Sequence, residues 1–367
     1  PIIDEGLFAY QLNDDGVSYS ISRGAMFNEL FDSSNIILPE SYNGKPITGI
    51  IESGFSGILE VDYITFPDSL TMIGNNAFAW STFKSINITR NVEYIGYELL
   101  NQSPRTKSIT VDINNPYLMS NNTDSIIRKN DKTLLSGCVS SRIPEGVEII
   151  RDYALSGVSF NREITLPTSL RKIGDYAFSG SNICGDLIIP NNVTSIGDYA
   201  FNCNIIEKIF FNEKIEEIKY GAFGLNRELD AISCEENPRY LAKDNCLIDK
   251  ETNMVILGCN NSIIPNSVYG IGSVAFYGSS IVELFIPNGV QFIDNNAIRG
   301  CHELQSVYIS KSVNFIDNGN FKECENIESF VVDSANTAYN SGINGNGLAK
   351  DGVLICGFKT TDLSKFY

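Results

Sequence analysis

The chain has 367 residues, a formal net charge of −17 and a hydrophobic content of 43%, which is ordinary for a folded protein. This acidic excess argues against nucleic acid as a partner, because phosphate binding needs clustered Lys and Arg. No stretch approaches the roughly 18 consecutive apolar residues of a membrane helix, so we expect no membrane-spanning segment.

The chain begins at Pro1 rather than Met, so we expect a processed or trimmed form whose missing signal peptide indicates no compartment. Near the start, Asn13-Asp14-Asp15-Gly16 is typical of a tight hairpin turn. Residues 1–48 lack the repeated phrase described next, although Ile36-Ile37-Leu38-Pro39 already matches its strand. We predict that residues 1–48 form an N-terminal cap over the first apolar edge of a repeat array.

One short phrase occurs ten times between Ile50 and Phe321: isoleucine, usually Gly or Asp, two variable residues, a small residue and a large apolar residue. Clear copies are residues 73–78, 173–178 and 196–201. The first isoleucines of successive copies are 22 or 23 residues apart, except for two steps of 55 and 53. A fixed period of this length indicates a solenoid, in which each unit buries its apolar edge against its neighbours.

Each 23-residue unit contains further regular features. Alternation such as Leu284-Phe285-Ile286 predicts a short strand with one buried face. A proline usually follows and should end the strand. In the phrase itself, we predict a tight turn at Gly, a crowded small residue at Ala and a core-filling aromatic residue at Phe. The outer wall should consist of turns, extended pieces and short helical turns.

The two long steps contain an inserted module, and a third copy begins near Asn336, which places modules near 113–141, 235–262 and 334–360. In the second module, the apolar runs at 245–250 and 254–257 predict a β-hairpin. Such insertions either carry a binding site or only widen a coil and change its curvature. The array then covers residues 49–367. Its C-terminal end has the features expected of a longer array that has been cut.

The nine cysteines are odd in number and include no CxxC pair. Cys301 and Cys324 lie one period apart, Cys203 falls near the same position of the unit, and Cys138 and Cys259 match each other in two modules. This regular placement predicts small buried hydrophobic residues, rather than disulfides or metal ligands.

The unit resembles a leucine-rich repeat, and its Ile-Pro-xx-Val-xx-Ile-Gly-xx-Ala-Phe pattern is similar to the BspA-like repeats of surface proteins from host-associated anaerobic bacteria and some parasitic protists. The resemblance covers nearly the whole chain. It implies a right-handed leucine-rich-repeat solenoid, β-rich, with short strands on the concave face and little helix. It also implies a secreted or surface-anchored adhesion protein, and it transfers no catalytic residue.

The residues themselves point to no enzyme and no cofactor. His302 is the only histidine, so Ser-His-Asp catalysis, Cys-His catalysis and most zinc sites would need it, yet it lies at a predicted coil corner. The acidic pairs Glu216-Glu217 and Glu235-Glu236 carry no specific signal in so acidic a chain. The glycine-rich residues 342–347 lack the strand and helix of a phosphate loop, and residues 14–16 are too short for a calcium loop.

A binding role is better supported, because one side chain of each strand should point outward between two buried ones. These outward residues are Thr65, Asn87, Thr110, Arg142, Thr165, Ile188, Phe210, Ser233, Ile263, Phe285, Tyr308 and Val331. Phe285 and Tyr308 lie on successive strands and are our candidate ligand-binding residues, since exposed neighbouring aromatic rings suit protein or glycan contact. The alternative is that a bend or the third module covers them.

These features predict a non-enzymatic protein, secreted or on the cell surface, that binds an extracellular protein or glycan as a monomer. The alternative is a structural spacer that displays another domain of a longer surface protein. A signal peptide and further C-terminal domains in the full-length gene would help to separate the two.

Overall fold

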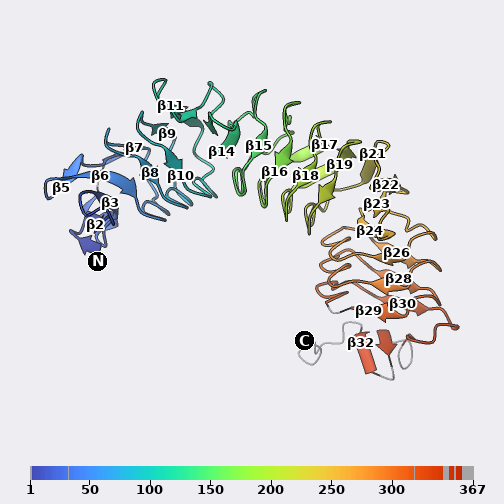
Figure 1. The fold of residues 1–367 in the computed structure, drawn as a ribbon. Helices are drawn as coiled ribbons and strands as arrows, with labels where there is room; N and C mark the ends of the chain where they lie inside the picture. Colours follow the sequence, from blue (N-terminus) through green and yellow to red (C-terminus); the bar gives the residue numbers. More distant parts are fainter. Residues whose placement is uncertain (1, 32, 318, 342–346, 351–352, 358–367) are drawn as a thin grey trace. The chain divides into compact units, whose positions relative to one another are not determined.

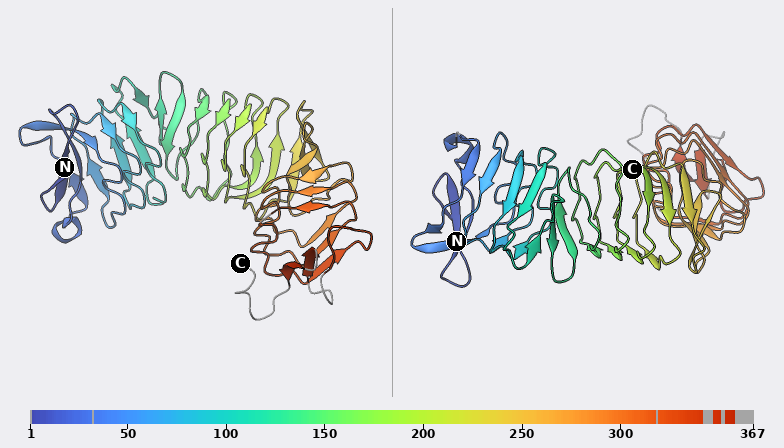
Figure 2. Two further views of the ribbon diagram at one scale, coloured as in Figure 1. Left: turned by 60° about the horizontal axis from the view of Figure 1, so that its bottom comes forward. Right: turned by 90° about the horizontal axis from the view of Figure 1, so that it is seen from above.

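The computed structural model describes residues 2–31, 33–317, 319–341, 347–350 and 353–357, with side chains as far as residue 350. The chain folds as two compact units, residues 1–183 and 184–367. Each unit is a stack of β-coils, as the ribbons in Figure 1 and Figure 2 show. The predicted solenoid is therefore confirmed, and α1 (Phe27–Leu30) is the one α-helix in the part of the chain that the structure describes.

The first unit opens with an antiparallel meander of β1 (Ile2–Asp4), β2 (Phe8–Leu12) and β3 (Tyr19–Arg23). The predicted tight turn joins β2 to β3, where the Gly16 N–H donates to the Asn13 carbonyl oxygen at 3.0 Å. β3 then pairs in parallel with β6 (Lys45–Ile50), the first strand of the array. That residues 1–48 act as a cap stays a prediction.

Two parallel ladders run through the coils of this unit, with equivalent residues in register from one coil to the next. The first ladder contains β4 (Asn35–Ile37), β7 (Tyr63–Thr65), β9 (Ser85–Ile88) and β11 (Ser108–Val111). The second contains β6, which also pairs with β5 (Ser41–Tyr42), then β8 (Met72–Ile73) and β10 (Tyr94–Ile95). The first module supplies β12 (Leu118–Met119), β13 (Ser125–Arg128) and β14 (Thr133–Gly137), followed by β15 (Ile149–Ile150) and β16 (Lys172–Ile173).

The second unit repeats this plan. Its first coils contain β17 (Cys184–Ile188), β18 (Ser195–Ile196), β19 (Ile205–Phe211), β20 (Glu217–Ile218) and β21 (Ala231–Cys234). The second module contains β22 (Tyr240–Lys243), β23 (Cys246–Asp249) and β24 (Met254–Leu257). The later coils contain β25 (Gly270–Ile271), β26 (Glu283–Ile286), β27 (Phe292–Ile293), β28 (Ser306–Ile309), β29 (Phe315–Ile316) and β30 (Ser329–Val332), and the antiparallel pair β31 (Gly347–Lys350) and β32 (Val353–Gly357) follows.

Proline follows the first strand of its coil at Pro39, Pro67, Pro190 and Pro287, as predicted, whereas no strand of the described chain directly precedes Pro144, Pro167 or Pro265. In the clearest coils, the N–H three residues after the proline donates back to the proline carbonyl oxygen, for example from Val290 to Pro287 at 3.1 Å and from Val193 to Pro190 at 3.0 Å. This turn leads into a second short strand that ends on the phrase isoleucine. The sequence did not predict this second ladder, because a two-residue strand shows no measurable alternation.

The phrase isoleucines and aromatic residues form the core, with Ile73, Phe78, Ile173 and Phe178 all fully buried. Burying such a side chain stabilises the fold by about 1.5–3 kcal/mol. Backbone bonds link the phrases of successive coils, as where the Phe201 N–H donates to the Ala222 carbonyl oxygen at 2.7 Å. The outer wall consists of turns and two-residue strands, and the short helical turns that we expected do not occur in the described part of the array.

The glycine after the isoleucine does not make the predicted turn. A Cβ on Gly74 would lie 2.7 Å from the Glu52 nitrogen, so this residue is small because the preceding coil passes close to it. The left-handed residue comes two positions later, at Asn76 (φ 54°) and Tyr199 (φ 52°), and Gly221 (φ 60°) occupies the same position. The conformation that favours glycine is therefore at a position that the sequence left variable.

Gly221 provides a test of coil crowding, because a Cβ there would lie 2.6 Å from the Tyr199 ring. We expect Gly221→Ala to lower the free energy of unfolding by about 2–3 kcal/mol through a left-handed alanine and a displaced ring. Gly180 is the matched control, since its φ is +63° and a methyl carbon added there would have no described atom within 4 Å. Gly180→Ala should lower the free energy of unfolding only by the cost of a left-handed alanine, about 1 kcal/mol. Equal losses in chemical denaturation would contradict the crowding.

Candidate functional site

Nine residues of the predicted outward row lie on strands, whereas Arg142, Thr165 and Ile263 lie in segments without a strand. All twelve residues of the row are exposed except Tyr308, which is half-buried. In the second unit β26, β28 and β30 place Phe285, Tyr308 and Val331 side by side in parallel register. We call these three residues the aromatic ladder.

The two rings of the aromatic ladder are parallel, with their centroids 4.4 Å apart and an interplanar angle of 3°. Phe285 is 58% exposed and Val331 is 51% exposed. The Tyr308 hydroxyl lies 3.5 Å from a carboxylate oxygen of Asp333, at the limit of a hydrogen bond. The ladder is thus an apolar strip whose aromatic side chains already support each other.

The same row differs in character between the two units. In the first unit it contains Thr65, Asn87, Thr110, Arg142 and Thr165. In the second unit it contains Ile188, Phe210, Ser233, Ile263 and the aromatic ladder. The coils of the two units have the same plan, but the outward side chains are polar in the first unit and mostly apolar in the second. Packing of the coils therefore does not determine which residue type occupies the row.

The inserted modules contain the predicted hairpin and one strand more. In the second module β23 and β24 pair in antiparallel register, and β22 adds a third strand that the sequence did not reveal. The first module has the same order, with β12, β13 and β14. The last strand of each of these two modules then pairs in parallel with the next coil.

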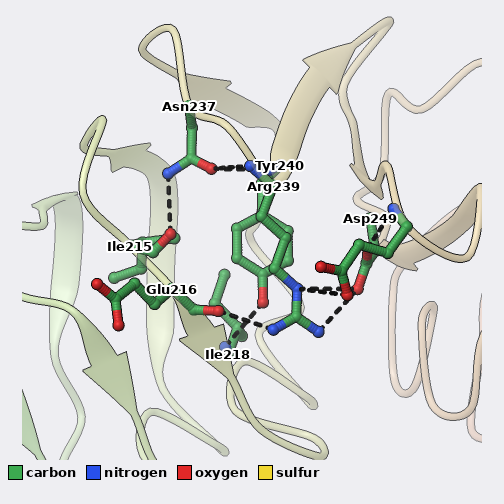
Figure 3. Close-up of polar contacts among 8 residues, drawn as sticks. Ile215, Glu216, Ile218, Asn237, Arg239, Tyr240 and Asp249 are labelled. Carbon is green, nitrogen blue, oxygen red and sulfur yellow. Dashed lines mark hydrogen bonds and ion pairs between the residues drawn. The ribbon is translucent and has the colours of Figure 1, made fainter.

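An asparagine begins each module, and in the first two modules it is buried. In Figure 3 the Asn237 amide donates to the Ile215 carbonyl oxygen at 2.9 Å and accepts from the Tyr240 N–H at 2.8 Å. The equivalent Asn115 and Asn336 donate to carbonyl oxygens of the preceding coil and accept two N–H bonds of their own segment. This residue is a structural clasp between module and coil.

Beside the clasp of the second module, Arg239 fills the space between the module and the preceding coil. Its guanidinium donates to Asp249 at 3.1 Å and to the Glu216 carbonyl oxygen at 2.8 Å, as Figure 3 shows. Asp249 is 5% exposed. A buried carboxylate needs such a partner, so this pair belongs to the architecture.

The first module leaves the corresponding space open. A cleft of about 410 Å³ lies between the module and the preceding coils, and we call it the module cleft. Its wall includes Met72, Glu93, Tyr94, Tyr117, Arg128 and Asn130. Tyr117 stands two residues after the clasp, as Arg239 does, and Arg128 ends its strand as Asp249 does.

Arg128 pairs with Asp131 of its own module. Its guanidinium donates to this carboxylate at 2.6 and 3.0 Å. These hydrogen bonds hold the pKa of Asp131 below its ordinary value. Sequence reasoning missed the module cleft because its wall comes from four separate segments, although Tyr94 and Tyr117 are 23 residues apart, the period of the array.

The cysteines whose side chains are described are all free thiols. Cys301 and Cys324 are buried as predicted, and each also donates to a carbonyl oxygen of the preceding coil, at 3.1 and 3.0 Å. Ser81 and Ser103 make the same bond in the first unit, both at 2.9 Å. The position therefore selects a small donor. Cys203 lies outside it and is exposed.

The remaining candidates show no convergence of reactive groups. His302 is half-buried at a coil corner, and the two acidic pairs, Glu216-Glu217 and Glu235-Glu236, are exposed. Asp15 accepts bonds within its own turn, and the Ser18 hydroxyl lowers its pKa. In the glycine-rich segment, residues 342–346 lie outside the described part of the chain.

Two searches of the described residues have plain results. No three His, Cys, Asp or Glu side chains among them are grouped closely enough to hold a metal ion. Likewise, within those same residues no helix has the length and apolarity needed to cross a membrane.

The clasp can be tested in the second module. Asn237→Ala removes five hydrogen bonds at a site that is 2% exposed and leaves buried backbone groups without partners. We expect it to lower the free energy of unfolding by about 2–4 kcal/mol. Asn266→Ala is the control, since Asn266 is exposed in the following coil and should change stability by no more than about 0.5 kcal/mol. Similar effects in urea denaturation would contradict the clasp.

Thiol reactivity should follow burial. Burial raises the pKa of Cys138 to about 11 and that of Cys246 to about 12, so both thiols are protonated at neutral pH. We expect iodoacetamide to label Cys203 in the native protein, and to label Cys138, Cys246 and Cys301 only after denaturation. Peptide mapping by mass spectrometry gives the order. Early labelling of Cys246 would contradict the packing of the second module.

Comparison with known proteins agrees with this architecture. The family model described as "BspA type Leucine rich repeat region (6 copies)" matches residues 19–123, 135–251 and 255–346. Comparison with curated protein sequences gives no match.

Solved structures of leucine-rich-repeat proteins from gut bacteria are similar to this chain. One from Eubacterium ventriosum is 18% identical, with a TM-score of 0.49 and coverage of 90% of this chain and 72% of its own. A leucine rich cell surface protein from Faecalibacterium prausnitzii is 18% identical, with a TM-score of 0.42 and coverage of 91% and 95%. A protein from Bacteroides ovatus is 19% identical, with a TM-score of 0.39 and coverage of 91% and 100%. Since the family model matches well over half of the residues, the chain belongs to the BspA-type leucine-rich-repeat family.

Proposed function

We propose that the protein is a non-enzymatic interaction protein, secreted or on the cell surface, that adheres to an extracellular partner. Proteins of the BspA-type family are surface-associated, and their repeats are generally non-catalytic binding repeats. The observation that carries the proposal is the aromatic ladder, which we assign as the surface that contacts a protein partner.

The ladder suits a contact surface for two physical reasons. Its side chains are large, apolar and in contact with water, so covering them yields a hydrophobic gain. The 4.4 Å stacking of Phe285 on Tyr308 restricts both rings before any partner arrives, so little side-chain freedom remains to be lost on binding. Aromatic residues of this kind are enriched among those that dominate binding energies.

The double variant Phe285→Ala/Tyr308→Ala tests this assignment. We expect it to weaken binding to a partner found on an array of extracellular matrix proteins by at least about tenfold, because each ring should act as a hot spot. The thermal unfolding temperature should change little, since one ring is mostly exposed and the other is half-buried. Biolayer interferometry and circular dichroism provide the two measurements.

Thr65→Ala/Thr110→Ala is the matched control, because these residues occupy the same outward row on β7 and β11 of the first unit. It should bind like the unmodified protein. Equal loss in both variants, or unchanged binding in the ladder variant, would count against the ladder. If no partner binds at micromolar concentration, the alternative of a structural spacer is favoured instead.

A further inference from the structure

The module cleft stands out because related positions have different chemistry in the two modules. In the second module the matching residues are polar, with Ser195, Glu217 and Arg239 in place of Met72, Tyr94 and Tyr117. Arg239 spans that space through its bonds to Asp249 and Glu216. The first module keeps the clasp and the hairpin but replaces the spanning arginine with tyrosine. Folding alone does not require this exchange, since both modules share the asparagine clasp and the same antiparallel strand pairing.

The exchange leaves large side chains in contact with water around a concave space. Tyr94 is 47% exposed, Tyr117 is 44% exposed and Met72 is 40% exposed. The cleft volume of about 410 Å³ lies at the small end of the range for ligand pockets, about 300–1,000 Å³. The space therefore suits a short ligand segment with a flat apolar face.

The charges in the wall restrict the ligand further. Arg128 is already paired with Asp131, so it offers no free cation to a phosphate, sulfate or carboxylate group. Glu93 makes no ion pair with any described residue and would repel an anion. The Glu93 carboxylate is exposed and solvated, so it gives a cationic ligand only a weak, screened attraction. A wholly apolar ligand would remove water from Glu93, Arg128 and Asn130 without replacing their hydrogen bonds.

We propose that the module cleft binds a neutral sugar unit of a glycan. A pyranose ring has an apolar C–H face that matches the tyrosine and methionine side chains, and the tyrosine ring faces carry partial negative charge. Its hydroxyl groups both donate and accept, so the Glu93 carboxylate can accept from them while the Asn130 amide does both. The guanidinium of Arg128 adds donors on the same wall. This site is separate from the aromatic ladder and does not depend on the function proposed for it.

The test uses the full chain and a panel of neutral probes: lactose, maltose, cellobiose and di-N-acetylchitobiose. Saturation-transfer NMR identifies which probe binds, and calorimetric titration gives its Kd, expected in the range of about 0.1–10 mM for a single shallow site. Tyr94→Ala and Tyr117→Ala should each weaken binding by about tenfold or more. Tyr63→Ala is the matched control, because Tyr63 is 45% exposed on β7, does not line the cleft, and should leave the Kd unchanged.

The double variant Tyr117→Arg/Arg128→Asp supplies a second readout, since it installs the ion pair of the second module and should close the cleft. We expect it to abolish sugar binding while the protein still unfolds cooperatively. The Phe285→Ala/Tyr308→Ala variant should retain sugar binding, which separates this inference from the ladder. The proposal is overturned if no probe binds at about 10 mM, if Tyr94→Ala and Tyr117→Ala bind like the unmodified protein, or if an uncharged tyrosine-rich peptide binds the cleft and the sugars do not.

Discussion

The parallel hydrogen bonding of each coil to the next is the constraint on which the rest of the structure depends. It fixes the separation of neighbouring strands at about 4.8 Å, and side chains in equivalent positions must then stack at nearly that spacing. The ring centroids of Tyr153 and Tyr176 are 4.9 Å apart, and those of Phe201 and Phe223 are 5.4 Å apart. The exposed aromatic ladder, at 4.4 Å, follows the same geometry on the outer surface. A buried aromatic core and an exposed aromatic strip thus arise from one repeat distance.

This constraint also explains which substitutions the array accepts. The position of Cys301 and Cys324 is held by Ser81 and Ser103 in other coils, because any small side chain that donates to the preceding carbonyl oxygen fits there. The position two residues after the clasp accepts tyrosine or arginine, because its side chain lies in the space between the module and the preceding coil. Exchange of Cys for Ser at the buried position preserves the fold. Exchange of Arg for Tyr at the module position changes the surface and leaves the module cleft open.

Much of the fold was predictable from the sequence because repetition multiplies a weak local signal. One Ile-Gly-xx-Ala-Phe phrase means little, but ten in register predict a stack, its buried spine and its outward row. The prediction failed where an element was too short to show a pattern, or where a residue is determined by contact with another coil. The two-residue strands were missed, β22 was missed, and Gly74 was assigned a turn although its role is to let the backbone of the preceding coil approach.

The sequence by itself determined the period, the buried faces, the hairpins of the modules and the adjacency of Phe285 and Tyr308, because each depends on spacing along the chain. Only the tertiary structure decided how the side chains use the space between coils. The clasp of Asn237, the Arg239–Asp249 pair and the open module cleft depend on contacts between segments separated by ten or more residues. Spacing records which residues share a row, but it does not record that Arg128 takes Asp131 as its partner.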